Sequence, residues 1–182
     1  MTRIMIIRHA EKHTDDGIAG RGVDIHGVHT KHELTVRGWL RAGALAHFFS
    51  PAFGLPDHAP ISTPRTIFAS AATKRSPSLR PHRTVEPLAA LLGVPIDVNH
   101  ACGEEAAMAG AALAAPGPVL ISWHHSHIPE LARHIAGEPP GCPHQWPDDR
   151  FDVVWVLDRA DAAWRFSQVP QRLFATDRVG VI

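Results

Sequence analysis

The sequence predicts an α/β protein, a three-layer α/β/α sandwich with a mostly parallel central sheet. Residues 5–7 and 119–121 form short, continuous, β-branched apolar runs, which are typical of parallel strands that helices cover on both faces. Helical patterns alternate with the apolar runs along the chain, as such an architecture requires. Ligands of these folds bind at the carboxyl ends of the strands, so the residues that end each run matter most.

A first helix is expected over residues 36–49, after the first apolar run. Thr35 can cap its amino end, because a threonine side chain accepts a hydrogen bond from the free amides there. Apolar residues recur at every fourth position of this segment, which predicts one buried stripe along the helix. The residues of this expected stripe are Val36, Leu40, Ala44 and Phe48.

Prolines divide the segment that follows. A loop is expected over residues 51–65 and a strand over 66–69. Pro81 can open a helix, since the first helical turn needs no amide hydrogen from it. Pro87 lacks the amide that a helix interior requires, so a break is expected there, with a second helix over 87–92.

The second half of the chain predicts two more helices and a final pair of strands. An alanine-rich helix is expected over residues 104–115, and a helix opened by Pro129 is expected to run to about residue 136. A proline-rich loop over 137–149 then leads to strands over 151–157 and 164–169. These last two are candidates for an antiparallel pair at an edge of the sheet.

Length and composition fit one soluble domain over residues 1–182. Hydrophobic residues make up 45% and charged residues 20% of the chain, near globular averages, so composition favours neither disorder nor membrane residence. Eighteen basic residues balance eighteen acidic ones, which argues against the broad positive field of a nucleic-acid-binding protein. No signal-peptide core is visible at the amino terminus. Cys102 and Cys142 lack CxxC spacing, so reduced thiols and a cytoplasmic location are expected.

Both predicted buried strands end at histidine. Arg8 and His9 follow the first run, and His124 and His125 follow the second. A histidine backed by an arginine presents a nucleophile beside an anion clamp, which indicates phosphoryl chemistry. Adjacent strands lie about 4.8 Å apart, so the two imidazoles could flank one phosphate. The sequence leaves open whether the two strands are neighbours.

Four segments share a pattern with one known family: Arg8-His9-Ala10-Glu11-Lys12, Leu34-Thr35 with Gly38 and Ala42, Arg80 four residues before Thr84, and the later strand that ends in histidine. Together they resemble the histidine phosphatase superfamily, also called the phosphoglycerate mutase-like family, over most of the chain. The resemblance implies that fold and a phosphatase activity. It also implies a transiently phosphorylated first histidine, surrounded by two arginines and a second histidine.

The resemblance makes His9 the expected nucleophile, with Arg8 and Arg80 as clamps for the phosphoryl oxygens. A neutral imidazole can attack phosphorus when its other nitrogen is held as a donor, and guanidinium groups bind phosphoryl oxygens bidentately. Arg75 is the alternative second clamp and a candidate substrate contact, whereas Arg83 is expected to be solvated. Such a site needs no metal, and the sequence shows no carboxylate cluster for magnesium at a strand end, so no cofactor is expected.

The second histidine and the proton donor are less certain from the residues. His125 is preferred, because a branch of the family places a tryptophan and one variable residue before its histidine and Ile-Pro shortly after it. His124 is the alternative, and strand alternation allows only one of the two to reach the phosphate. Glu105 is favoured as the acid that protonates the leaving group, with Glu11 and Glu104 as the other candidates.

The expected substrate is a phosphomonoester, carried by a small molecule or a phosphoprotein, with no nucleic acid or membrane as partner. A phosphoglycerate mutase-like phosphotransferase is the alternative within the enzymes, although the chain is short for one. A non-enzymatic metal-binding protein is the other alternative, because the chain has fourteen histidines, and His26, His29 and His32 recur every third residue. Neighbouring glycines favour a loop there. Substrate identity and oligomeric state are not determined by the sequence.

Overall fold

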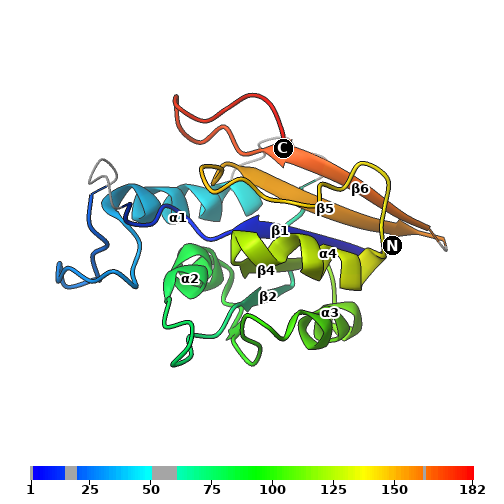
Figure 1. Cartoon of the computed structure of the whole chain (residues 1–182), viewed down its shortest axis with the longest axis horizontal. Coiled ribbons are helices and arrows are strands. Elements are labelled where there is room, and N and C mark those ends of the chain that lie inside the picture. The colour runs from blue at the N-terminus through cyan, green and yellow to red at the C-terminus, as the bar shows by residue number, and fades with distance from the viewer. Residues whose placement is uncertain (1, 15–19, 51–60, 162) are drawn as a thin grey trace.

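The computed structural model describes residues 2–14, 20–50, 61–161 and 163–182 (Figure 1). Its strands are β1 (Thr2–Arg8), β2 (Thr66–Ala69), β3 (Ile96–Asp97), β4 (Val119–Trp123), β5 (Val153–Ala160) and β6 (Ala163–Pro170). They form one sheet in the order β3-β2-β4-β1-β5-β6. Pairing is parallel from β3 to β1 and antiparallel at β5 and β6. The expected mostly parallel sheet with an antiparallel pair at one edge is confirmed.

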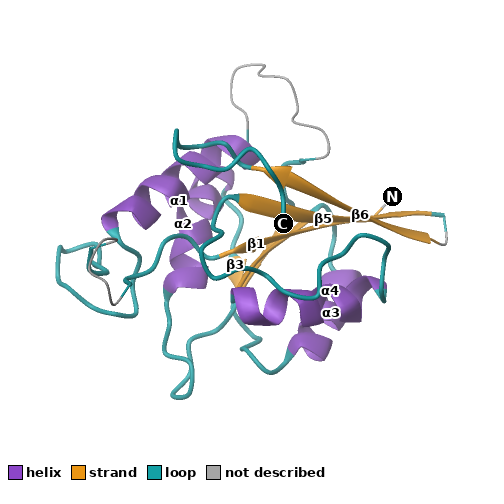
Figure 2. Ribbon diagram, turned by 45° about the horizontal axis from the view of Figure 1, so that its top comes forward, coloured by secondary structure: helices purple, strands orange, loops and turns teal. Residues whose placement is uncertain are grey.

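Helices cover both faces of this sheet. They are α1 (Val36–Phe49), α2 (Arg80–Leu92), α3 (Glu105–Ala114) and α4 (Ile128–Ala136), with a 3₁₀ turn, η1 (His125–His127), before α4. Figure 2 shows α1 and α2 on one side of the strands and α3 and α4 on the other. Neighbouring residues of β1 point to opposite faces, so Ile7 packs in one core with Leu45 of α1, while Ile6 packs in a second core with Leu131 of α4. The three-layer sandwich is therefore confirmed.

Helix α1 has the predicted bounds, but of the four residues in the predicted stripe only Phe48 is buried. Thr35 caps it as expected, because its side chain accepts a hydrogen bond from the Gly38 amide. Val36 and Leu40, however, are 65% and 62% exposed. Gly38 packs instead against the chain that leaves β1, where a Cβ atom on it would lie 2.6 Å from the Glu11 carbonyl oxygen. This close approach sets the rotation of the helix and buries Ala42, Leu45, Ala46 and Phe49.

The break expected at Pro87 is wrong, because α2 is one helix with Pro87 inside it. Pro81 does lie in its first turn. A proline in a helix interior costs about 3 kcal/mol. Val85 and Leu88 are each 1% exposed, and burial of such side chains contributes about 1.5–3 kcal/mol each. Packing of this face against the sheet is therefore large enough to offset the lost helical hydrogen bond.

The remaining elements follow the sequence prediction closely. Helices α3 and α4 occupy the expected segments, and residues 137–149 form an irregular loop. Strands β5 and β6 extend further toward each other than expected, and Asp161 adopts a left-handed backbone with φ of 58° between them. The two-residue edge strand β3 was missed, because two residues carry no readable alternation. Residues 51–60 of the expected loop lie outside the described residues. No described helix is long and apolar enough to cross a membrane.

Candidate active site

The histidines that follow β1 and β4 meet at the carboxyl edge of the sheet. The two strands are parallel neighbours, with Arg8 opposite Trp123, and the ladder continues where the His9 amide donates to the Trp123 carbonyl at 3.1 Å. The next residue pair in this register is His9 and His124. Their ring centroids lie 5.5 Å apart, with the rings nearly perpendicular at 78°. The adjacency that the sequence left open is therefore present.

The structure places His124, and not the preferred His125, next to His9. His124 lies against His9, whereas His125 begins the turn η1 and its Nε2 atom lies 3.2 Å from Oδ1 of Asp148. Only one of the two histidines faces His9, as alternation requires. The residues of β4 are buried on both faces. The strand therefore has no polar alternation from which the sequence could predict whether His124 or His125 points toward His9.

His9 is held in one neutral form. The side chain is 2% exposed, and its Nδ1 atom lies 2.7 Å from the Ala10 carbonyl oxygen. A carbonyl oxygen can only accept, so Nδ1 carries the proton and the lone pair is on Nε2. Burial, followed by the charges of Arg8 and Arg80, lowers the pKa of His9 well below its usual value. The imidazole is therefore neutral and can act as a nucleophile near pH 7.

Arg8 ties the site to the loop before β5. Its Nη1 atom donates to the carbonyl oxygens of Pro147, Asp148 and Arg150 at 3.3, 2.6 and 3.2 Å, and Nη2 donates to the Asp148 carboxylate at 3.0 Å. The guanidinium carbon lies 3.8 Å from the ring centre of Phe151. Burial lowers the pKa of Arg8 to about 10, although Asp148 opposes this shift. Of its side-chain nitrogen atoms, only Nε has no partner among the described residues.

Arg80 approaches the same point from the first residue of α2. Its Nη1 atom donates to the Lys31 carbonyl oxygen at 2.7 Å, and burial lowers its pKa. Its charge lowers the pKa of Arg8 and of His9. Arg75, the alternative clamp, is exposed in the preceding loop.

Thr84 explains the four-residue spacing after Arg80. Its hydroxyl donates to the Arg80 carbonyl oxygen and accepts from the Ala10 amide, each at 2.8 Å. One turn of α2 thus joins the start of the helix to the chain that leaves β1. The buried Thr84 side chain thus fixes the backbone of Arg80 relative to the backbone next to His9.

Three nitrogen atoms around His9 lack hydrogen-bond partners. Within the described residues, Nε of Arg8, Nε of Arg80 and Nε2 of His124 are all buried and unpaired. Burial, followed by the charge of Arg80, lowers the pKa of His124 to about 4. Buried polar atoms rarely lack partners in folded proteins. Arg8, His9, Arg80 and His124, hereafter the anion site, therefore form a place where an external acceptor would complete the hydrogen bonding.

Within the described residues, none of the three candidate acids forms a hydrogen bond or ion pair with His9. The Glu11 carboxylate is buried and accepts from Arg41. Glu104 accepts from a backbone amide near the start of α3. Glu105 is 3% exposed and accepts from Trp123 Nε1 at 3.1 Å and from a backbone amide. The role of proton donor stays a prediction for all three residues.

Asp148 was missed by the sequence reasoning. Its Oδ1 atom lies 3.0 Å from Arg8 Nη2, 2.9 Å from Lys12 Nζ and 3.2 Å from His125 Nε2. Partial burial opposes ionisation, but the hydrogen bond from Lys12 and the charge of Arg8 lower the pKa of Asp148 overall. The residue comes from an irregular loop 140 positions after Arg8. No spacing or periodicity in the sequence could have indicated it.

Arg83 is not a solvated side chain, contrary to expectation. Its Nε atom donates to Glu33 at 3.1 Å, and its Nη1 atom donates to Glu86 at 3.0 Å. These pairs raise its pKa despite partial burial, the largest opposing effect. Arg83 thus belongs to an ion-pair group beside the site.

The histidine-rich segment forms a loop, as the glycines suggested. His26 and His29 are exposed, and an isolated bridge joins Val23 to His29 across a turn. Both cysteines, Cys102 and Cys142, are free thiols.

No protein-family model and no curated protein matches this sequence. Solved structures do match. The phosphoserine phosphatase of Entamoeba histolytica, in complex with 3-phosphoglyceric acid, is 13% identical with a TM-score of 0.58, over 95% of this chain and 99% of that one. The alpha-ribazole phosphatase of Shigella flexneri is 13% identical with a TM-score of 0.57, over 99% of each chain. A mycobacterial glucosyl-3-phosphoglycerate phosphatase, in complex with VO3, is 16% identical with a TM-score of 0.52, over 91% of this chain and 96% of that one. Identity this low shows the fold alone, so this chain shares the fold of these three phosphatases.

Proposed function

We propose that this chain is a phosphatase that hydrolyses phosphomonoesters through a phosphohistidine on His9, without a metal. The observation that carries the proposal is the anion site, where a neutral imidazole lies among buried nitrogen atoms that lack partners. Phosphoryl transfer needs little covalent machinery beyond a nucleophile, because positioning and preorganised positive groups supply most of the catalysis. The similar solved structures named phosphatases support the same class.

The first step joins His9 to phosphorus. Nε2 of His9 attacks in line, the bond from phosphorus to the leaving oxygen breaks, and that oxygen departs with its electron pair and takes up a proton. Ala10 holds the Nδ1 proton throughout. The Nε–H groups of Arg8 and Arg80 donate to the equatorial oxygens, whose charge they stabilise.

The second step returns His9 to its starting state. Water attacks the phosphohistidine, the bond between nitrogen and phosphorus breaks, and inorganic phosphate leaves. His124 is neutral, because burial lowers its pKa to about 4, and its Nε2 contributes a hydrogen bond to the phosphoryl group rather than a charge. Water as the acceptor makes the enzyme a phosphatase, whereas a second alcohol would make it a phosphotransferase.

We assign the role of proton donor to Glu105. This assignment needs its own test, because the Glu105 carboxylate accepts hydrogen bonds from Trp123 and a backbone amide. An aryl leaving group departs without an acid, but an alkyl leaving group does not. If Glu105 supplies the proton, Glu105→Gln lowers the hydrolysis of alkyl phosphates far more than that of aryl phosphates. Equal effects on both substrates exclude Glu105 from this role.

Hydrolysis of p-nitrophenyl phosphate, with and without a chelator, tests the proposal. We expect chelator-resistant release of inorganic phosphate, and a loss of at least about 10³-fold in kcat for His9→Ala. Alkaline quenching during turnover should trap one acid-labile, base-stable phosphoryl group per chain in the wild type. His134→Ala is the matched control, because His134 is exposed on α4. Full activity in His9→Ala, or activity that a chelator abolishes, contradicts the proposal.

A further inference from the structure

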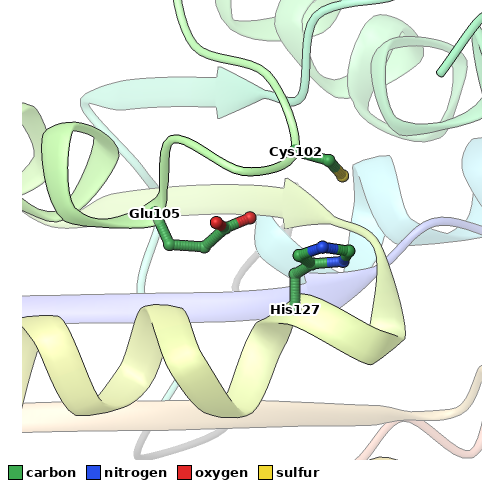
Figure 3. Close-up of side chains that lie close together, drawn as sticks. All are labelled: Cys102, Glu105 and His127. Atoms are coloured by element: carbon green, nitrogen blue, oxygen red, sulfur yellow. The ribbon is translucent and has the colours of Figure 1, made fainter. Parts of the chain in front are cut away.

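Three side chains with metal-ligating atoms meet beside the anion site. Cys102 comes from the loop before α3, Glu105 is the first residue of α3, and His127 ends the turn η1. Figure 3 shows the three side chains directed toward a common space. One ligand atom of each lies within 4.8 Å of the other two. The cluster shares Glu105 with the candidate proton donors, but neither Cys102 nor His127 has a role in the proposed hydrolysis.

The carboxylate at the centre of this group is buried without a counter-charge. Glu105 is 3% exposed, and both of its oxygens accept from the Gly103 amide at 3.0 and 3.1 Å. Trp123 Nε1 donates to one oxygen at 3.1 Å. No cationic side chain of the described residues pairs with it, whereas buried Glu11 pairs with Arg41. An unpaired buried carboxylate is costly, and a bound cation would offset that cost.

The donor set indicates which cation would fit. A thiolate, an imidazole and a carboxylate are the ligands of zinc, and three protein ligands leave the fourth tetrahedral position open to water or to a substrate oxygen. Magnesium and calcium select oxygen ligands and are disfavoured by the sulfur and nitrogen atoms. The group therefore suits a divalent transition metal of the zinc type.

Neighbouring groups already orient each ligand. Ser126 Oγ lies 2.9 Å from Nδ1 of His127, which leaves Nε2 as the ligand nitrogen. Ser70 Oγ lies 3.7 Å from the Cys102 sulfur, and Trp123 with Gly103 holds the Glu105 carboxylate. Such outer contacts fix the tautomer and orientation of metal ligands in established sites.

We propose that Cys102 Sγ, the Glu105 carboxylate and His127 Nε2 bind one zinc-type cation. The attack of His9 on phosphorus needs no metal, but a Glu105 carboxylate bound to a cation cannot also protonate the leaving group, so metal binding and the proton-donor role of Glu105 exclude each other. Trp123, the last residue of β4, links the cluster to His124, the next residue of the chain. Binding converts the thiol to a metal-bound thiolate and releases its proton to solvent. Metal affinity should therefore rise with pH, because the ligand is the thiolate.

Cobalt titration of the full chain, purified without a histidine tag and freed of metal, tests the proposal. We expect one equivalent of Co²⁺ to give a thiolate-to-cobalt charge-transfer band and intense tetrahedral d–d bands, both removed by one equivalent of Zn²⁺ but not by Mg²⁺. The charge-transfer band should disappear in Cys102→Ser. It should persist in Cys142→Ser, the matched control at the other free cysteine.

Loss of the imidazole provides a second, independent variant. His127→Ala should weaken Co²⁺ binding at least about 100-fold, whereas His134→Ala should leave it unchanged. Both replaced histidines are near the surface, so each variant is expected to fold, which circular dichroism checks. A band that survives Cys102→Ser, or unchanged affinity in His127→Ala, overturns the proposal. Because these readouts contain no substrate, their failure leaves the phosphatase proposal untouched.

Discussion

Buried arginines occur in two contrasting settings in this molecule. Arg41 of α1 donates to the carboxylates of Glu11 and Asp177 at 2.7–3.1 Å, and these partners raise its pKa even though burial opposes the shift. Arg8 is also buried and Arg80 is partly buried, but the Nε atom of each has no partner among the described residues, and burial lowers the pKa of both. Arg41 is neutralised by carboxylates of the protein itself, whereas Arg8 and Arg80 keep donors that an external anion could use.

The contrast shows how one structure provides both anchoring and binding. Glu11 lies two residues after His9, and its carbonyl oxygen accepts from both the amide and the hydroxyl of Thr35 at the start of α1. The saturated Arg41 cluster thus fastens the chain that carries the nucleophile. The ion pairs of Arg41 stabilise the fold. This stability offsets the cost of the positive groups without partners in the neighbouring anion site, a cost that is common at functional sites.

Replacement of Arg41 should have the largest effect on stability. Arg41→Ala removes the cation that pairs with both buried carboxylates and leaves Glu11 with Arg37 alone, and breaking such a buried pair typically costs about 3–5 kcal/mol. Urea denaturation followed by circular dichroism measures the change. A loss below about 1 kcal/mol would show that this cluster is not the anchor that the comparison makes it.

Replacement of Arg80 should affect catalysis instead of stability. Arg80→Ala removes a preorganised donor from the phosphoryl oxygens, so kcat/KM for p-nitrophenyl phosphate should fall about 10²–10³-fold. The free energy of unfolding should stay equal or rise, because the repulsion between Arg80 and Arg8 disappears. Arg133→Ala, an exposed arginine on α4, serves as the control for both measurements. If Arg80→Ala markedly lowered the free energy of unfolding, Arg80 would be a stabilising residue like Arg41, and the comparison would be wrong.

The two adjacent histidines give the next test. His124→Asn should lower kcat/KM about 10²-fold, because it removes the Nε2 contact to the phosphoryl group. His125→Asn should change it about twofold or less, since His125 contacts Asp148 at the surface side. Steady-state kinetics on one aryl phosphate decide between them. The reverse order of effects would place His125 in the anion site, as the family pattern alone suggested.

Acid should destabilise the protein in a defined pH window. Burial lowers the pKa of His124 and His125 from 6.5 to about 4, and that of His9 lies well below 6.5. Between about pH 6.5 and 4 the unfolded chain therefore binds more protons than the folded chain. Unfolding free energy should fall as pH drops, by up to about 1.4 kcal/mol per pH unit for each such histidine.

Chemical denaturation at several pH values measures this slope. The His124→Asn variant should show a shallower decline than the wild type, because one of the three contributing groups is gone. A wild-type stability that is flat from pH 7 to 4 would mean that these histidines take up protons in the folded protein as readily as in the unfolded chain. Their pKa values would then not be lowered, contrary to this prediction.

Local patterns were enough to predict most elements of the fold. Short β-branched runs, a threonine cap before α1 and prolines at the starts of helices act over a few residues, so the sequence shows them directly. Errors arose where longer-range packing decided. The rotation of α1 depends on the contact of Gly38 with the Glu11 backbone, and the continuity of α2 past Pro87 depends on burial of Val85 and Leu88.

By itself the sequence determined the chemical content of the site: an arginine and a histidine at the end of one buried strand, histidines at the end of another, and Arg80 one helical turn before Thr84. Only the tertiary structure decided which of these groups meet. The register of β1 on β4 brings His124 rather than His125 to His9, and a distant loop brings Asp148 to Arg8. A strand that is buried on both faces shows no polar alternation, so the sequence could not predict which histidine meets His9. Contacts between distant segments leave no local pattern, so it could not predict the contact of Asp148 with Arg8.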